Sequence, residues 1–383
     1  MTTIRQIEVF PVGVPITRGF TFASGNAGEV GQKAVLVFVK ITASSGEIGW
    51  GECRPMPTWS YETAHSVVTA LRHHLIPAVL GLEIWDRSGL HLRMSAAIGR
   101  GPSTGQPIAK AALDLALHDL CARTAGLPLR AFLGGNSAPV SLPLSWTCTA
   151  HTADEAASDV ETGSAAGYAH FNFKAAVAPA TDLAVARELV TRAPAGAFIW
   201  ADCNQGFQLH DAVRMAQAFE QLGVALLEQP LAADQLHLMA QLRARTTIAL
   251  AVDEASVSPG DFFAHARAGL VDYLVVKLTR SGGLWPTSQQ LGVAASAGLP
   301  FVVSGLTDGL LTKLAAGQIA AAAGVRRPLA LNGSQFLDES ALYSAKARVE
   351  HHGSIHLDAS PGIGVHPDEA QIRALSLPAF AAL

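Results

Sequence analysis

The chain of 383 residues is poor in charge and in cysteine, and it lacks any long uninterrupted apolar run. Charged residues make up 15% of the sequence and hydrophobic residues 49%, a balance that excludes a disordered chain. No apolar run reaches the roughly 18 residues of a membrane helix. The N-terminus, MTTIRQIEVF, lacks the apolar core of a secretory signal. We therefore expect a globular cytoplasmic protein that does not contact a membrane.

The four cysteines stand far apart and include no Cys-x-x-Cys pair. This spacing argues against a disulfide framework and against a zinc knuckle. The formal net charge is -4 and basic runs are absent, so the chain offers nucleic acid no electrostatic footprint. We expect reduced thiols and a small-molecule partner.

One glycine-rich segment, GRGPSTG at residues 99–105, superficially resembles a phosphate-binding loop. It follows no clear strand, and it lacks the Gly-Lys-Ser/Thr ending that gives such a loop its lysine and hydroxyl. We therefore predict that this segment is not a P-loop.

The first 134 residues are typical of a mixed α+β domain. The segments TIRQIEVFPV, AVLVFVKITA and GEIGWGECR alternate like strands, and two segments with helical periodicity follow them. The Gly/Pro-rich segment 356–383 is expected to return to this domain and complete it. We predict an N-terminal α+β capping domain over residues 1–134.

Between residues 135 and 355 the pattern changes to short apolar strands that alternate with Ala-rich helices. Strand-helix alternation implies parallel strands with crossover helices, and eight such units suit a closed barrel. We predict a modified TIM barrel in this part of the chain. The eight expected strands are VSLPLSWT, HFNFKAA, AFIWADCN, VALLEQP, IALAVDEA, DYLVVKLT, PFVVSGL and LALNGSQ.

Five consecutive expected strands end in a charged residue. These residues are spaced by 24 to 28 positions, about one strand-helix unit each, so a barrel would bring all five to one mouth. An Asp at a strand end often only caps the next helix, and a terminal Lys often faces solvent. The regular series favours a functional site instead. It consists of Lys174, Asp202, Glu228, Asp253 and Lys277.

Three acids among these five would repel one another unless a cation neutralises them. Their expected ligand atoms are all oxygens, with no His or Cys at the matching positions of the pattern. Oxygen donors favour Mg²⁺ over Zn²⁺, with Mn²⁺ as an alternative. We predict a metal site at Asp202, Glu228 and Asp253.

With these motifs the chain resembles the enolase superfamily, and within it the muconate lactonizing enzyme subgroup of the mandelate racemase/muconate lactonizing enzyme-like proteins. The resemblance covers nearly the whole length. The motifs that carry it are GWGECRP, AALDLALHDLCARTAGLPLRAFLGG, GYAHFNFK, ADCNQGF, LLEQP, AVDEAS, VVKLTRSGG and SPGIGV.

The resemblance implies a capping domain over a (β/α)7β barrel. It also implies that a bound Mg²⁺ stabilises the enediolate formed when a lysine removes a proton α to a carboxylate. Lys174 and Lys277 would be the acid/base residues. We assign Asn172, Asn204 and Glu254 to positions next to the metal ligands or the substrate.

Lys174 and Lys277 end the second and sixth expected strands, so they should face each other across the substrate. Opposed bases suit removal of a proton from one face of a carbon and its return to the other. This arrangement favours an isomerase of a small carboxylic acid, meaning a racemase, epimerase or cycloisomerase. A dehydratase of a hydroxy or sugar acid, which would give a keto acid, is the enzyme alternative. A catalytically inactive barrel that serves as a binding protein is the third.

The sequence departs from the family pattern at three places. The usual Lys-x-Lys motif reads Asn172-Phe173-Lys174, so one positive charge is lost. The seventh strand lacks the His of the mandelate racemase subgroup, which favours Lys277 as second base. The eighth lacks the acid that many relatives place there, leaving Asn332, Ser334 or Gln335 either for substrate contact or for ordinary loop roles.

Two cap loops are candidates for determining specificity. They would close over the mouth of the barrel and bring an apolar wall to the substrate, although aromatic side chains could equally serve cap packing. Related barrels often form oligomers, so we also expect a homo-oligomer. The candidate residues are Arg18, Phe20, Phe22, Trp59 and Tyr61.

Overall fold

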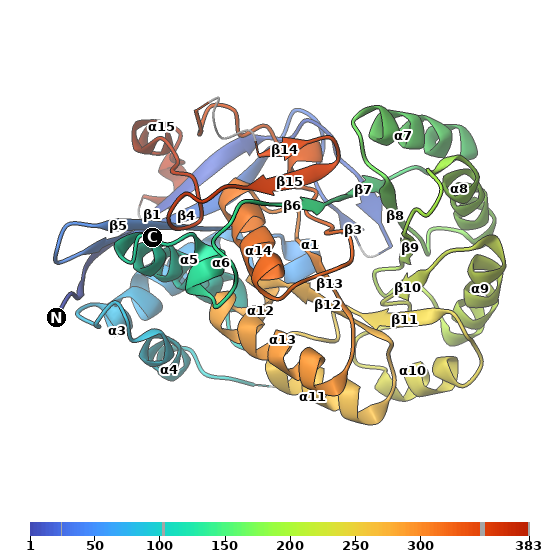
Figure 1. Cartoon of the computed structure of the whole chain (residues 1–383), viewed down its shortest axis with the longest axis horizontal. Helices are drawn as coiled ribbons and strands as arrows, with labels where there is room; N and C mark the ends of the chain where they lie inside the picture. The colour runs from blue at the N-terminus through green and yellow to red at the C-terminus, as the bar shows by residue number, and fades with distance from the viewer. Residues whose placement is uncertain (24, 102–103, 345–348, 382–383) are drawn as a thin grey trace.

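The computed structural model describes residues 1–23, 25–101, 104–344 and 349–381. Its N-terminal part is an antiparallel sheet of order β1-β4-β5 that packs on helix α5 (Figure 1). The three strands predicted here are therefore confirmed. The elements of this part are β1 (Ile4–Pro15), β2 (Thr21–Phe22), β3 (Gly25–Asn26), β4 (Lys33–Ala43), β5 (Ile48–Cys53), α1 (Pro57–Ser60), α2 (Ala64–Ala70), the π-helical turn η1 (Leu71–Leu75), α3 (Ile76–Val79), α4 (Arg87–Ala97), α5 (Pro107–Thr124) and α6 (Leu129–Phe132).

Helix α5 lies in close contact with β5 because two glycines leave room for its backbone. A Cβ atom built on Gly49 would lie 2.3 Å from the carbonyl oxygen of Ala116, and one on Gly51 would lie 2.1 Å from that of Ala112. Both distances are far below van der Waals contact. The helix is buried on nearly every side between the sheet and the rest of the chain, and its buried face includes the polar residues Lys110, Asp114 and His118.

This close approach makes Gly51 a sensitive position. We expect Gly51→Ala to lower the free energy of unfolding by about 2 kcal/mol, because overpacking a tight contact forces backbone shifts. Gly292→Ala is the matched control, since its Cβ would meet no atom within 4 Å inside helix α13. Chemical denaturation measures both, and an unchanged Gly51→Ala protein would contradict the packing argument.

The second part of the chain is a parallel sheet of seven strands in sequence order, β7 to β13, surrounded by helices (Figure 1). The predicted barrel fold is confirmed. The strands are β7 (Ser145–Cys148), β8 (His170–Lys174), β9 (Ile199–Asp202), β10 (Leu226–Glu228), β11 (Ala249–Val252), β12 (Tyr273–Lys277) and β13 (Phe301–Ser304). The helices are α7 (Ala153–Ala165), α8 (Pro179–Arg192), α9 (Leu209–Leu222), α10 (Leu236–Arg243), α11 (Pro259–Ala268), α12 (Leu278–Ser281), α13 (Leu284–Ala297) and α14 (Leu310–Ala322).

The eighth predicted strand is reduced to two bridging residues. Leu329 pairs with Leu144 just before β7, and Ala330 pairs with Ser304 of β13, so this segment closes the ring between the first and last strands. Pro328 has no N–H to donate, and a 3-10 turn begins at Gly333, so the segment has no room for a longer strand.

The barrel interior has an apolar layer beneath its polar end. Trp200, Leu226, Ala251 and Val275 belong to one buried cluster, and each lies two residues before a charged strand-end residue. Because side chains alternate along a strand, these apolar residues and the charged ones share the inner face. The outer face carries residues such as Phe173, which packs against Phe219 of α9 with ring centroids 5.6 Å apart.

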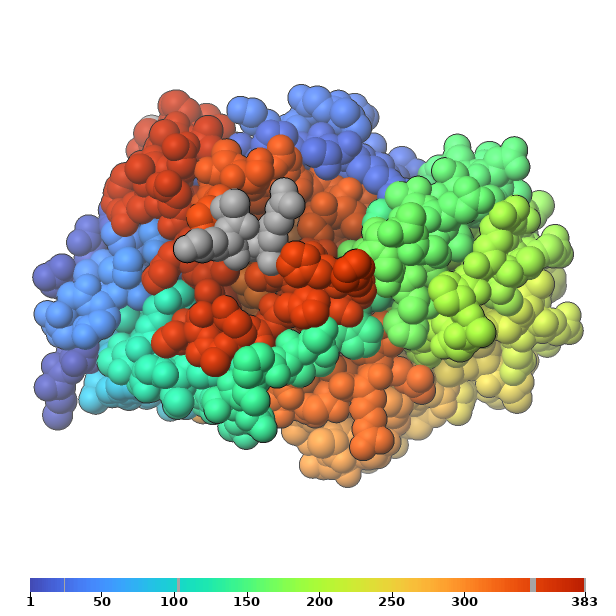
Figure 2. Space-filling view, turned by 45° about the horizontal axis from the view of Figure 1, so that its top comes forward, coloured from blue at the N-terminus to red at the C-terminus, as the bar shows by residue number. Residues whose placement is uncertain are grey.

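The last part of the chain returns to the N-terminal sheet. The backbone N–H of Leu377 donates to the carbonyl of Pro11 (2.8 Å), and Arg373 pairs with Glu8 (2.8 Å). Figure 2 shows the dark red C-terminal segment beside the blue N-terminal residues. The elements after the barrel, with β6 that precedes it, are β6 (Val140–Pro143), η2 (Gly333–Gln335), β14 (Glu350–His351), β15 (Ser354–Leu357), α15 (Glu369–Ala374) and η4 (Pro378–Phe380). None of the helices in the described ranges combines the length and apolar content of a membrane span.

Candidate active site

The strand ends carry the five charged residues to one end of the barrel. Lys174, Asp202, Glu228 and Lys277 are the last residues of β8, β9, β10 and β12, and Asp253 directly follows β11. The parallel register places Lys174 opposite Asp202 and Asp202 opposite Glu228 on neighbouring strands. Regular pairing of parallel strands thus brings together side chains that lie far apart in the sequence.

Each lysine forms a buried ion pair with a carboxylate of the set. Lys174 Nζ lies 2.6 Å from Asp202 Oδ2, and Lys277 Nζ lies 2.6 Å from Asp253 Oδ2. Lys174 is 4% exposed and Lys277 is 3% exposed. Burial favours the neutral amine, but the carboxylates of Asp253, Glu228 and Asp202 together outweigh it and raise the pKa of Lys277.

Two residues that the sequence reasoning missed complete this cluster. The guanidinium of Arg280, on the short helix α12, donates to Asp253 Oδ1, and its Nη2 has no protein partner. Gln229 accepts hydrogen bonds from the backbone N–H groups of Asp253 (2.9 Å) and Ala255 (3.1 Å). Both residues lie one to three positions past a charged strand end. A search of the few residues just past each strand end, in addition to the residue that closes it, would have found them.

Asn204 links Lys174 to Glu254 through two hydrogen bonds. Its Oδ1 accepts from Lys174 Nζ (3.0 Å) and its Nδ2 donates to Glu254 Oε1 (3.0 Å). The other oxygen of Glu254 is buried without a partner. Burial, with Asp253 nearby, raises the pKa of Glu254 to about 6. Asn204 and Glu254 therefore lie next to the proposed ligands, where the sequence placed them.

The carboxylates differ in how well they are compensated. Burial would raise the pKa of Asp253, but Arg280 and Lys277 hold it below its ordinary value. Glu228 has a raised pKa because it is buried and has Asp202 and Asp253 as neighbours. Its Oε2 accepts only a neutral hydrogen bond, from Trp200 Nε1 at 2.9 Å. Negative charge is thus in excess around Glu228.

The donor set fits a hard divalent cation. Asp202, Glu228 and Asp253 offer only oxygen atoms as ligands, which Mg²⁺ and Mn²⁺ prefer. A cation bound beside Glu228 would neutralise the carboxylate that has no positively charged partner among the described residues. Within the described parts of the chain, no group of three or more His, Cys, Asp or Glu side chains is placed closely enough to hold a metal ion. Lysine ammonium groups occupy one oxygen each of Asp202 and Asp253.

Three aromatic residues of the cap lie over Lys174, and one of them, Trp59, also lies over Lys277. We call Phe20, Phe22 and Trp59 the aromatic lid. Lys174 Nζ lies 4.5 Å from the centroid of the Trp59 ring, and Lys277 Nζ lies 4.8 Å from it. Phe22 stacks on Trp59 with centroids 4.9 Å apart. Trp59 is 8% exposed, and its indole N–H has no partner. The lid supplies an apolar wall directly over the charged groups.

The other two specificity candidates lie elsewhere. Arg18 forms an ion pair with Asp159 of α7 (2.7 Å) and donates to Thr149 (2.8 Å), so its charge fixes the lid segment to the barrel. Tyr61 is 62% exposed and has a left-handed backbone (φ 53°) at the end of α1. The structure therefore brings three of the five candidates to the lysines and leaves these two outside.

Asn172 is buried in the barrel wall and binds the neighbouring strand. Its Oδ1 accepts from the hydroxyls of Ser145 (2.8 Å) and Thr147 (3.1 Å) on β7. Asn332 Nδ2 donates to the same Thr147 hydroxyl (2.9 Å), which links this network to the segment that closes the barrel. The side chain at position 172 thus joins β8 to β7.

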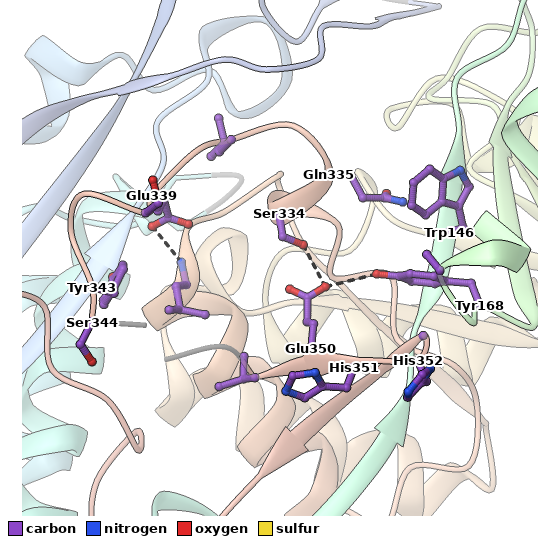
Figure 3. Close-up of a pocket in the computed structure, with 16 residues that line it drawn as sticks. Trp146, Tyr168, Ser334, Gln335, Glu339, Tyr343, Ser344, Glu350, His351 and His352 are labelled. Carbon is purple, nitrogen blue, oxygen red and sulfur yellow. Dashed lines mark hydrogen bonds between the residues drawn. The ribbon is translucent and has the colours of Figure 1, made fainter. Parts of the chain in front are cut away.

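Two residues after the closing segment line a separate cavity of about 760 Å³, shown in Figure 3. Ser334 points to Glu350, to which its hydroxyl donates (2.9 Å), and Tyr168 donates to the same carboxylate (3.2 Å). Gln335 lies beside Trp146 in Figure 3 and accepts from the Thr147 N–H at 3.2 Å. In this structure Ser334 and Gln335 hold loops, the ordinary role that the sequence left open for them.

The buried amide of Gln229 provides a test of how the site is held. We expect Gln229→Leu to cost about 1–3 kcal/mol of unfolding free energy, because the N–H groups of Asp253 and Ala255 would lose their acceptor. Gln229→Glu, which keeps the acceptor oxygens, should retain more of the native hydrogen exchange protection at these two amides. Equal protection in the two variants would contradict this role.

Family models match both parts of the chain. Residues 6–134 match the N-terminal domain model of mandelate racemase / muconate lactonizing enzyme. Residues 152–371 match the model described as enolase C-terminal domain-like. Together these ranges cover the aromatic lid and every charged strand end described above.

Characterised relatives are isomerases. L-Ala-D/L-Glu epimerase of Bacillus subtilis (strain 168) is 29% identical over 321 residues, 83% of this chain and 85% of the relative. Chloromuconate cycloisomerase of Pseudomonas putida is 31% identical over 300 residues, 77% of this chain and 78% of the relative. These names agree with the predicted isomerase and give no support to a dehydratase.

Solved structures share the fold across nearly the whole length. The dipeptide epimerase of Cytophaga hutchinsonii, complexed with Mg and the dipeptide D-Ala-L-Val, superposes with a TM-score of 0.89. It is 23% identical, and the match covers 98% of each chain. With both family models matched and the barrel in place, the chain belongs to the mandelate racemase / muconate lactonizing enzyme family of the enolase superfamily.

Proposed function

We propose that the protein is a divalent-cation-dependent epimerase or racemase of a small carboxylic acid. One observation carries this proposal: Lys174 on β8 and Lys277 on β12 both approach the Trp59 ring, at 4.5 and 4.8 Å, from strands separated by three others. Two ammonium groups on opposite sides of one space can serve the two faces of a carbon atom. A cycloisomerase needs only one of them.

The walls of the site support an acid with an apolar part and an uncharged N-substituent. The aromatic lid covers the lysines, and the wall near the closing segment carries the neutral side chains of Asn172, Thr147 and Asn332. No acid stands at the closing segment to pair with a free ammonium group. We therefore propose an N-acylated amino acid as substrate, in preference to a dipeptide with a free amino terminus.

Asp202, Glu228 and Asp253 would hold the cation, with Mg²⁺ first and Mn²⁺ as the alternative. When bound, it stabilises the negative charge that develops on the substrate carboxylate. Asn204 orients Lys174 through its 3.0 Å hydrogen bond, so that this amine can take the α proton. Lys277 then returns a proton to the opposite face. Because both lysines are buried under the aromatic lid, the lid must move for substrate to enter.

The two-base proposal predicts opposite defects in two variants. With Mg²⁺-loaded protein in D₂O, the unmodified enzyme should deuterate the α carbon of both enantiomers of an N-acyl amino acid, as read by NMR. Lys174→Ala should stop exchange from one enantiomer and Lys277→Ala from the other, each by roughly 10²-fold or more, because each face loses its base. The exposed Lys33→Ala is the control. If Lys277→Ala left exchange from both enantiomers unchanged, the proposal would be wrong.

The metal site makes a separate prediction that needs no substrate. Asp202→Asn and Glu228→Gln should each weaken Mn²⁺ binding by roughly tenfold or more, because each removes an anionic oxygen ligand. Titration followed by the electron paramagnetic resonance of free Mn²⁺ measures this directly. Asp261→Asn, which alters an acid at the start of α11 outside the cluster, is the control. Equal affinities in all variants would place the cation elsewhere.

We also propose the domain boundaries, the cytoplasmic location and the homo-oligomeric state that the sequence predicts. The separate matches at residues 6–134 and 152–371 support a boundary near residue 135. The contacts of Leu377 and Arg373 with β1 support assigning the C-terminal segment to the cap.

A further inference from the structure

A second cavity, of about 560 Å³, lies between the cap and the barrel helices. We call it the interface cavity. Helix α4 and the segment before α5 form one wall, and the beginnings of α11 and α13 form the other. Its basic residues are His91, Arg100 and Lys110, and Trp285 adds an aromatic wall. Among the described residues that line it, none is an Asp or a Glu.

The two permanent cations of this cavity lack carboxylate partners. Lys110 is buried, and its Nζ donates to the backbone carbonyl of Ile98 (2.8 Å) but makes no ion pair with a described residue. Burial, together with the neighbouring Arg100, lowers the pKa of Lys110 although Glu62 opposes this. Arg100 is exposed and also forms no ion pair within the described ranges. The exposed Arg100 repels the buried Lys110, and an anion between the two side chains would relieve this repulsion.

The carboxylates around the cavity are already used by other groups. Glu62 accepts from the first backbone N–H groups of α5, at 2.8 and 3.2 Å. Asp114 accepts from His91 (2.6 Å) and from the first N–H groups of α13. Asp261 accepts from the backbone of Ser258 at the start of α11 (2.7 Å). None of the three faces the hollow as part of its lining.

The rest of the lining suits an anion. Helix α11 begins at this cavity with Ser258 and Gly260, and a first-turn N–H such as that of Gly260 has no acceptor inside its own helix. The hydroxyls of Ser95 and Thr104 add further donors, whereas the hydroxyl of Ser281 already donates to Gln290 (2.7 Å). Positive side chains, a helix beginning and hydroxyl groups therefore converge on a lining that contains no carboxylate among its described residues.

We infer that the interface cavity binds a small anion of the phosphate type, held by Arg100 and Lys110. Arginine pairs with phosphate oxygens through two parallel hydrogen bonds, and lysine adds a point charge. This mode does not use a P-loop, because it needs no lysine and hydroxyl at the end of a glycine-rich loop. Positions 102–103 of that segment lie outside the described residues, and the proposal uses only Arg100 and Thr104 from it.

Pyrophosphate is the probe that tests this site. In buffer without divalent cations and at constant ionic strength, titration calorimetry should detect binding to the unmodified protein, and thermal unfolding should shift upward. Arg100→Gln should weaken the affinity by about tenfold or more, because an exposed guanidinium can be removed without disturbing the core. Lys110→Met should weaken it as well. Arg245→Gln removes an exposed arginine elsewhere and should leave the affinity unchanged.

The outcomes separate cleanly. Loss of affinity in Arg100→Gln with retention in Arg245→Gln would support the site, even if Lys110→Met proved too unstable to measure. Absence of any binding by the unmodified protein would overturn the proposal. Equal affinity in Arg100→Gln and the unmodified protein would do the same, because binding would then lie at another place, such as the lysines of the active site.

Discussion

The fold depends on neutralising a group of charges that the barrel forces together. Parallel strands in register deliver one charged side chain from the end of each of the five strands β8 to β12 to the same buried space. An unpaired buried charge costs several kcal/mol, so each of these groups needs its partners to remain in place. The group consists of the acids Asp202, Glu228, Asp253 and Glu254 and the cations Lys174, Lys277 and Arg280. The acids outnumber the cations, and the surplus falls on Glu228.

The apolar layer beneath this group fixes which residues reach it. Trp200, Leu226, Ala251 and Val275 fill the barrel two positions before the charged residues, so the same side-chain alternation sets both layers. A slip of one residue in any strand would move an acid to the helix side and an aromatic or aliphatic residue to the mouth. Packing of the lower layer therefore also secures the register of the site. The indole of Trp200 joins the two layers through its hydrogen bond to Glu228.

Sequence periodicity was enough to find the strand-end residues because parallel strands impose a regular spacing. The eighth strand was overestimated, since Pro328 and the turn at Gly333 restrict pairing to Leu329 and Ala330. Arg280 was missed because it comes from a short helix after β12 and not from the strand itself. From the sequence, the aromatic residues of the lid could be predicted only as candidates. Whether a loop residue such as Tyr61 points inward depends on its backbone conformation, which the sequence did not predict.

The neutral side chain of Asn172 in the barrel wall affects where the site can have positive charge for a substrate. A lysine at this position could not accept the hydroxyl hydrogen bonds that Asn172 takes from Ser145 and Thr147. Asn172 therefore ties β8 to β7 and brings no charge to this side of the site. Arg280 approaches the cluster from the far side, and its Nη2 has no protein partner. A guanidinium with a free donor beside Asp253 is able to bind a substrate carboxylate, so Arg280 offers on the β12 side a positive charge that the neutral Asn172 does not offer on β8.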